Sequence, residues 1–235
     1  MWKERWQAFF HALQPEHREV FRDHSSQVSY AWMLAMPLHT KPSLKLSNQQ
    51  VSVGLTTRAL NPGFVGNCPC GLRHLPSHDL SCRLKNNYRT ARHEALKRLF
   101  AANYKTCHCE VRYEPISQQP TSRDRGDLSV QGPAALNGLC VLDFSVVSPV
   151  NPQNHPLQRL LEERHNAKVV LYKTQFPGGE FFPVVMTTGG TLHPTAAKVL
   201  AKLADSGPGI QDLRIGISIS LLKTRSDYWY TAQGV

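Results

Sequence analysis

Three cysteines and one histidine lie close together in the sequence, as Cys68, Cys70, His78 and Cys82. Thiolates and an imidazole are the ligands that a structural zinc ion binds in tetrahedral geometry. Gly71 follows the second cysteine and suits a tight turn that brings backbone amides to the sulfur atoms. This spacing predicts a structural zinc site, and the alternative is three unligated cysteines in a loop.

His74 lies in the same loop and is a rival to His78 as a ligand. The other three cysteines are expected to be core side chains. Cys107 and Cys109 alternate with polar residues, which is typical of a half-buried strand, and Cys140 belongs to an apolar run. The N-terminus lacks the apolar segment of a secretory signal, so we expect an intracellular protein without a disulfide framework.

A carboxylate interrupts the longest apolar run, which extends from Leu139 to Val147 and contains Asp143. Placing a carboxylate inside an apolar strand is costly unless it is paired or bound to a metal ion. Hard cations such as Mg²⁺ prefer carboxylate oxygens. Asp143 is therefore a candidate ligand of a divalent cation.

Basic residues outnumber acidic ones, 27 to 17, which gives a net charge of +10. Such an excess favours a polyanionic partner, most simply nucleic acid. Part of it is concentrated in a run from Arg83 to Arg98. Arg89, Arg92, His93 and Lys97 occupy neighbouring positions of a predicted helix, and we expect them to bind phosphates in a salt-dependent manner. The alternative is a solvated helix face.

The elements that position these residues follow from hydrophobic periodicity and from the breaker residues. Helices are predicted over residues 1–23, 88–102, 194–205 and 210–226, and strands over 107–113, 127–131, 139–147 and 181–187. Residues 24–66 are mixed and loop-rich. A further helix starts at Pro156 and either continues to about 173 or ends near Asn166, with a strand over 168–173.

This order of elements predicts an α/β or α+β domain that follows a small metal-binding module. The expected divisions are an N-terminal segment over 1–66, the metal module over 67–87 and the main domain over 88–235. No apolar run approaches the roughly 18 residues that a membrane span needs, so we expect no membrane partner.

The cysteine cluster, followed by Arg92-His93-Glu94, resembles a region of site-specific non-LTR retrotransposon proteins. In that class, a Cys-Cys-His-Cys zinc knuckle lies past the reverse transcriptase. It is followed by an Arg-His-Asn/Asp motif and then by a restriction-like endonuclease of the PD-(D/E)XK fold. The resemblance covers roughly residues 28–225, and it rests on the order and spacing of several motifs.

The later motifs of the family also appear in order. They correspond to Glu114-Pro115, Arg125-Gly126-Asp127, Asp143-Phe144-Ser145-Val146, and Lys168 with Tyr172. The resemblance implies a mixed sheet flanked by helices and four catalytic residues, which are Asp127, Asp143, Lys168 and Glu114. Asp127 and Asp143 would bind magnesium or manganese, and Lys173 is the alternative to Lys168. Read without the resemblance, Asp127 would be a turn residue, Glu114 a solvated strand end and Lys168 a surface lysine.

Two positions depart from the family pattern: Gly126 replaces a proline, and Ser145 stands where the standard motif has lysine. The polymerase signature Tyr-x-Asp-Asp is absent from the sequence. We therefore expect a freed or domesticated C-terminal half of such a protein.

Three functions follow from these patterns. The first is a metal-dependent DNA endonuclease, which the retained acidic residues and Lys168 favour. The second is an inactive nuclease fold that binds RNA as a structural subunit of a ribonucleoprotein such as an organellar ribosome, which Gly126 and Ser145 favour. The third is a zinc-stabilised protein-interaction domain. The sequence leaves open whether the protein acts in the nucleus or in the mitochondrion.

Overall fold

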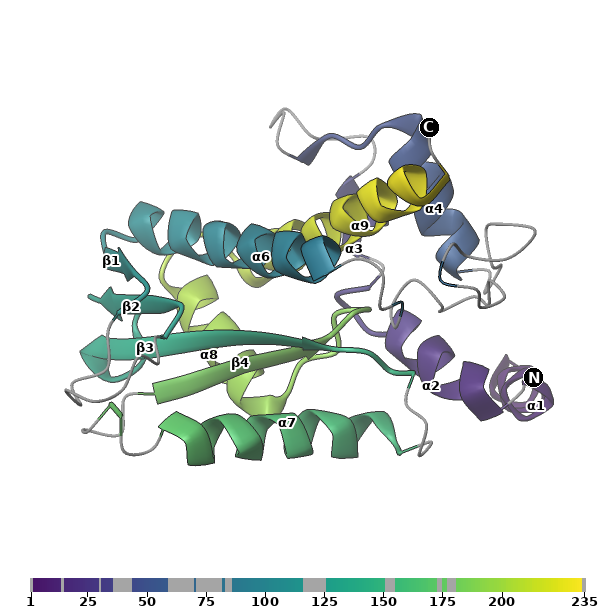
Figure 1. Cartoon of the computed structure of the whole chain (residues 1–235), viewed down its shortest axis with the longest axis horizontal. Helices are drawn as coiled ribbons and strands as arrows, with labels where there is room; N and C mark the ends of the chain where they lie inside the picture. Colours follow the sequence, from purple (N-terminus) through teal and green to yellow (C-terminus); the bar gives the residue numbers. More distant parts are fainter. Residues whose placement is uncertain are drawn as a thin grey trace.

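The computed structural model describes residues 2–13, 15–29, 31–35, 44–58, 70, 82, 86–115, 126–150, 155–172, 175–176 and 181–233 (Figure 1). Its helices are α1 (Trp2–Ala12), α2 (Pro15–His24), α3 (Ala31–Ala35), α4 (Asn48–Arg58), α6 (Asn86–Thr106), α7 (Leu157–Tyr172), α8 (Pro194–Asp205) and α9 (Ile210–Gln233). Its strands are β1 (Glu110–Tyr113), β2 (Leu128–Gln131), β3 (Leu139–Val147) and β4 (Phe181–Thr187). Among these residues, no helix combines the length and apolar character that crossing a membrane requires.

The four strands form one mixed sheet in the order β1-β2-β3-β4. The pairs β1–β2 and β2–β3 are antiparallel, whereas β3 and β4 are parallel and are connected through α7. In Figure 1, α6 and α7 lie on opposite sides of this sheet. The expected α/β class is therefore confirmed at the level of a mixed sheet flanked by helices.

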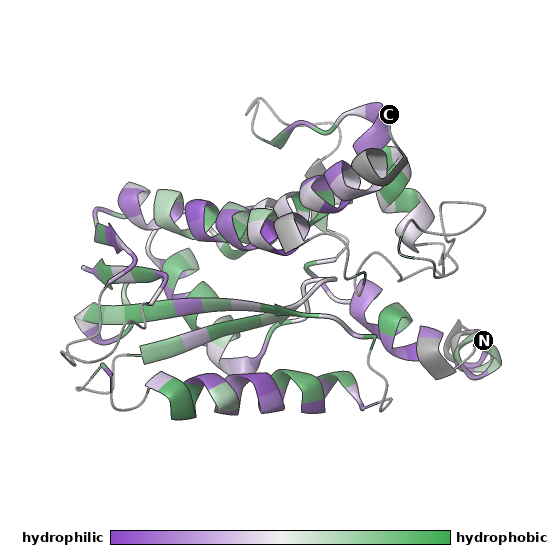
Figure 2. Cartoon of the chain, viewed as in Figure 1, coloured by the Kyte–Doolittle hydropathy of each residue, from purple (hydrophilic) through white to green (hydrophobic). Residues whose placement is uncertain are grey.

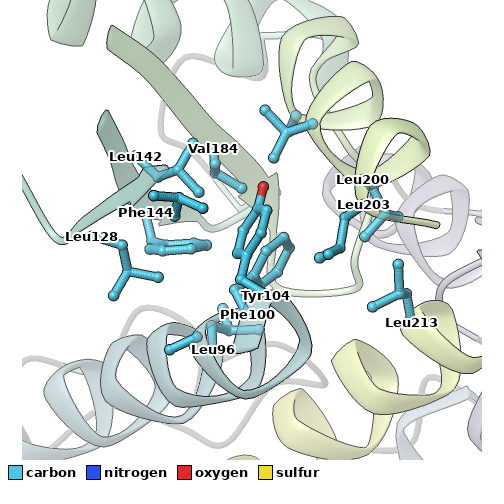
Figure 3. Close-up of a cluster of buried hydrophobic side chains, with 14 of the residues drawn as sticks. Leu96, Phe100, Tyr104, Leu128, Leu142, Phe144, Val184, Leu200, Leu203 and Leu213 are labelled. Carbon is cyan, nitrogen blue, oxygen red and sulfur yellow. The ribbon is translucent and has the colours of Figure 1, made fainter. Parts of the chain in front are cut away.

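The main core fills the space between the sheet and the helices α6, α8 and α9 (Figure 3). Phe100 and Tyr104 of α6 are among its largest side chains, and both are almost fully buried. Because α7 covers the opposite face, β3 is buried along most of its length, and apolar residues lie on both of its faces, with Asp143 and Ser145 as polar exceptions. Figure 2 shows the hydrophobic character of β3 and β4.

Several predicted elements agree with the structure. The bounds of β3, β4 and α8 are those that the sequence predicts. The helix that follows Pro156 continues to Tyr172, so the alternative strand over 168–173 is wrong for its described part. The predicted helix over 88–102 is α6, and that over 210–226 is the first part of the longer α9.

Other predictions need correction. The single helix over 1–23 is two helices, because Pro15 lacks an amide hydrogen and begins α2 instead of continuing α1. The loop-rich segment 24–66 contains α3 and α4. The strand over 107–113 begins only at Glu110, after a turn in which His108 has a φ of 58°. Cys107, Cys109 and Cys140 are buried in the core, as expected.

The N-terminal helices pack on the main domain. Trp32 of α3 and Val53 of α4 share a hydrophobic cluster with Ile219 and Trp229 of α9. Asp23 of α2 is fully buried, and its carboxylate accepts hydrogen bonds from the loop that follows β4, including the amide of Gly189 at 2.7 Å. The described part of the segment over 1–66 therefore packs against the domain that carries the sheet.

Candidate active site

Two aspartates lie next to each other at one end of the paired part of β2 and β3. Asp127 directly precedes β2, and its amide donates a hydrogen bond to the carbonyl of Leu142 (2.9 Å). Its Oδ2 atom accepts a hydrogen bond from the amide of Phe144 (2.6 Å). Since Phe144 follows Asp143 in β3, this bond holds the carboxylate of Asp127 beside the peptide that carries the second aspartate.

Asp143 lies on the face of β3 that is covered by α7, and it is only 4% exposed. Burial raises the pKa of this carboxyl group, and the negative charge of Asp127 raises it further. The ammonium group of Lys168 acts in the opposite direction, with Nζ 2.8 Å from Oδ2 of Asp143. The site thus concentrates two carboxylates and one lysine where solvent screens their charges poorly.

Lys168 reaches Asp143 because of its position on α7. The helix turns Leu161 and Tyr172 into the protein, and Lys168 lies one turn before Tyr172 on the same side. Its Nζ atom lies 5.3 Å from the centre of the Tyr172 ring. This face of the helix is turned toward the sheet. Lys173, the alternative lysine, lies outside the described residues.

His93 of α6 contacts Asp127 from the other face of the sheet. Its Nε2 atom lies 2.9 Å from Oδ1 of Asp127. The hydrogen bond with Asp127 raises the pKa of His93, although burial acts in the opposite direction. His93, predicted from the sequence to contact nucleic acid, is therefore placed where it orients a candidate metal ligand.

Glu114 lies at the margin of the site. Its side chain is about half exposed, and its carboxylate is 3.5 Å from Nζ of Lys97. Lys97 is buried, and its ammonium group lies 2.6 Å from the carboxylate of Glu94. Burial opposes the charge of Lys97, but the carboxylates of Glu94, Asp127 and Glu114 together raise its pKa. The ammonium group of Lys97 thus contacts two carboxylates of the protein. In this respect Lys97 differs from Arg89 and Arg92, which were also predicted to bind phosphate.

The donor set of the two aspartates is of the kind that a magnesium or manganese ion requires. Hard divalent cations bind carboxylate oxygens, usually from one or two side chains, and retain several waters. Burial raises the pKa of Asp143 and so disfavours its charged form, despite the neighbouring ammonium group of Lys168. A divalent cation between Asp127 and Asp143 would stabilise that charged form.

A groove of about 480 Å³ extends along β3 beyond the aspartates. β2 begins opposite Leu142. From Phe144 onward, β3 therefore pairs only with β4 among the described strands. The opposite edge of this part of β3 borders the groove. Arg89, Arg92 and His93 line it from α6, and Arg164 lines it from α7. Arg164 is not among the residues that the sequence predicts to bind nucleic acid, although it lies one turn before Lys168 on the same helix.

The side chain of Arg164 is held at Ser145, a position at which this chain departs from the motif of the resembling family. Its Nε atom donates a hydrogen bond to Oγ of Ser145 (2.6 Å). Ser145 lies two residues after Asp143 and therefore on the same face of β3, while Arg164 lies four residues before Lys168 on α7. The two cations thus lie opposite the two polar side chains of the strand, Lys168 at Asp143 and Arg164 at Ser145, so the helix runs antiparallel to the strand here.

A second polar cluster joins α7 to α8. Glu162, His165 and His193 offer ligand-type atoms within 4.8 Å of one another, a spacing that could hold a metal ion. However, Nδ1 of His193 accepts the amide of Thr195 (3.2 Å), which leaves the proton of the neutral ring on Nε2, and Nε2 lies 2.9 Å from Glu162.

The geometry of the two rings also argues against a metal ion in this cluster. The imidazoles of His165 and His193 stack with their centres 3.9 Å apart and an angle of 19°. Nearly parallel stacked rings do not direct their nitrogen lone pairs at one common point. In this arrangement the cluster caps the N-terminus of α8 through His193.

The predicted zinc ligands are described only in part. Cys68, His78 and the rival His74 lie outside the described residues, as does Arg125 before the first aspartate. Cys82 is buried, and Cys70 is half-buried against the cluster that Trp229 and Tyr88 form. The zinc site therefore stays a prediction.

In comparisons with known proteins, no family model and no curated protein matches this chain.

Proposed function

We propose that the chain is a nucleic-acid-binding protein with a metal-dependent DNA endonuclease site. The reaction is hydrolysis of a phosphodiester bond, and the site consists of Asp127, Asp143 and Lys168. The observation that carries this proposal is the ion pair between Nζ of Lys168 and Oδ2 of Asp143 (2.8 Å), which lies beside Asp127. Asp143 of β3, Lys168 of α7 and Asp127, which directly precedes β2, converge, although each has an ordinary structural role when considered alone.

Each residue has a defined part in this proposal. Asp127 and Asp143 would bind a magnesium or manganese ion through their carboxylates. Such an ion lowers the pKa of a bound water and stabilises negative charge on phosphate oxygens. Lys168 is placed to orient the attacking water by a hydrogen bond and to offset the charge of the scissile phosphate. His93 is a positioning residue that holds the carboxylate of Asp127 in place.

The fold supports the same proposal at a coarser level. A mixed sheet flanked by helices is the architecture that the resemblance to retrotransposon endonucleases implies, and the described sheet is of this type. Glu114 is assigned a supporting role, because its observed contact is with Lys97. The cysteine cluster around Cys70 and Cys82 is proposed to bind one structural zinc ion.

A second candidate is an inactive nuclease fold that binds RNA as part of a ribonucleoprotein. One observation favours it: Asp143 is nearly inaccessible, and its charge is already paired with Lys168. Both oxygens of Asp127 also have protein partners. A polar network of this kind would stabilise the fold of a protein that catalyses no reaction.

A plasmid-nicking assay in magnesium or manganese tests the proposal. Wild type is expected to nick the plasmid, whereas Asp143→Asn is expected to lose at least about a hundredfold in rate, as is usual for a residue that acts through the transition state. Asp205→Asn removes the same charge from the exposed end of α8 and is expected to cleave like wild type. Binding of RNA without cleavage by any variant would support the inactive scaffold instead.

A further inference from the structure

The groove beside the aspartates is positively charged, and its arginines have no acidic partner among the described residues. Arg89, Arg92 and Arg164 all line it. They come from two helices on opposite faces of the sheet, so the charge is not that of a single solvated helix face. The groove lies along β3 directly after Asp143.

Arg92 is the most informative of these residues. It is only 5% exposed, and two of its nitrogens, Nε and Nη1, are buried without a hydrogen-bond partner. Its guanidinium carbon lies 5.2 Å from the centre of the Tyr88 ring. A buried cation is costly when no anion or acceptor compensates it. The compensating anion is therefore expected to come from a ligand in the groove.

The opposite wall is arranged for the same kind of ligand. Arg164 is held by Ser145 through Nε, which leaves its terminal nitrogens for a ligand. Ser148 lies farther along the same wall. Guanidinium groups bind phosphate oxygens through pairs of parallel hydrogen bonds, and hydroxyl groups add further donors. A volume of about 480 Å³ is in the range of pockets that hold ligands, about 300–1,000 Å³.

We propose that this groove binds a backbone phosphate of the nucleic-acid strand, next to the phosphodiester at Asp127 and Asp143. This inference rests on the proposed function and names the residues that hold its substrate. Ser145 is two residues beyond Asp143 on one face of β3, a separation of about 6.6 Å along a strand. One nucleic-acid strand can therefore contact both sites. Arg92 and Arg164 contact this strand from opposite sides, and Arg89 extends the binding surface toward solvent.

Binding without a divalent metal tests the groove separately from catalysis. The probe is a fluorescein-labelled DNA duplex titrated in EDTA over a series of salt concentrations, with fluorescence anisotropy as the readout. Arg92→Gln and Arg164→Gln are each expected to weaken binding about five- to tenfold. The slope of log K against log salt is expected to fall by about one for each lost phosphate contact. An unlabelled RNA of the same sequence and inorganic phosphate serve as competitors.

The matched control is Arg98→Gln, which removes the same charge from an exposed position of α6 that does not line the groove. It is expected to bind within about twofold of wild type. Because Arg92 is buried, circular dichroism checks its fold, and the exposed Arg164 decides the outcome if Arg92→Gln does not fold. Binding by Arg164→Gln that equals the control would overturn the proposal.

The groove and the nuclease site fail in different ways. Wild type that binds DNA through Arg92 and Arg164 but never cleaves it would refute the nuclease and keep the groove. Cleavage by wild type with unchanged binding and cleavage in both arginine variants would refute the groove and keep the nuclease. Competition by inorganic phosphate as strong as that by nucleic acid would show a site for a free anion and would also overturn the proposal.

Discussion

The carboxylate of Asp127 accepts a hydrogen bond from the amide of Phe144, the residue that directly follows Asp143. This bond fixes one candidate metal ligand to the strand that carries the other. Asp127 is also held by His93 at 2.9 Å, so its carboxylate has little freedom to rotate. In the proposed site, this arrangement would preorganise the two carboxylates for a shared cation, and without one their charges repel each other.

Asp143→Asn is expected to make the metal-free protein slightly more stable. Burial and the charge of Asp127 raise the pKa of Asp143, so the folded state favours the protonated carboxyl group. The protonated carboxyl group stabilises the fold fully below the unfolded pKa of about 3.9. This stabilisation is lost as the pH rises through the folded pKa of Asp143. At pH 7 the neutral amide is therefore expected to stabilise the metal-free fold slightly.

Urea unfolding in EDTA measures this gain, with Asp205→Asn as the control for a lost surface charge. A loss of stability of more than about 1 kcal/mol in Asp143→Asn would mean that the ion pair with Lys168 stabilises the fold. That result would favour the scaffold over the nuclease.

His93→Gln is expected to lower stability most strongly at acidic pH. The bond with Asp127 raises the pKa of His93, so its contribution is fully present below the unfolded pKa of about 6.5. It is lost as the pH rises through the folded pKa. We expect a loss of about 1–2 kcal/mol near pH 5.5, as for a hydrogen bond to a charged group, and a smaller loss near pH 9.

Unfolding midpoints at the two pH values test this dependence. His11→Gln, at an exposed position of α1, should show no such pH dependence. Equal losses for His93→Gln at both pH values would contradict a charged pair with Asp127.

Gly126→Ala is expected to destabilise the fold by about 1–3 kcal/mol, as overpacking usually does. A methyl group at this position would lie 2.5 Å from Cγ1 of Val141 and 3.3 Å from Pro115. The amide of Gly126 also donates a hydrogen bond to the carbonyl of Pro115 (3.2 Å). A proline, as in the resembling family, would lose this bond, so glycine here fits the packing of this chain.

The double variant Gly126→Ala/Val141→Ala separates crowding from backbone effects. Removal of the valine methyl groups should recover part of the lost stability in thermal unfolding. If the two losses simply add, the contact with Val141 is not the cause.

Cys70→Ser is expected to abolish binding of the proposed structural zinc ion. Wild type should contain one zinc ion per chain by elemental analysis, because three thiolates and an imidazole complete a tetrahedral site. Chelation should destabilise wild type, since binding of a structural zinc contributes to folding. Cys107→Ser, in the core, should retain zinc, and a folded wild type without zinc would refute the site.

Much of the architecture follows from local patterns in the sequence. β3 is predictable because both of its faces are buried, and the only acidic residue in it is Asp143. The placement of Lys168 follows from its spacing to Tyr172 on one helix face. The break before α2 follows from Pro15, but the aromatic periodicity of residues 2–13 conceals it.

The contacts that complete the site are not predictable in this way. His93 and Asp127 are separated by 34 positions, and no local pattern pairs them. Arg164 reaches Ser145 only because α7 crosses β3 with Lys168 already opposite Asp143. The role of α9 as a shared support for α3 and α4 likewise depends on tertiary packing.

The central claim is that Asp127 and Asp143 hold a divalent cation. Titration of Mn²⁺ followed by electron paramagnetic resonance measures this most directly, since bound ions lose the sharp signal of free ones. We predict a bound Mn²⁺ in wild type, in Asp205→Asn and in His165→Asn, and its loss in both Asp127→Asn and Asp143→Asn. Binding that persists in folded Asp143→Asn, or that disappears only in His165→Asn, would contradict the account.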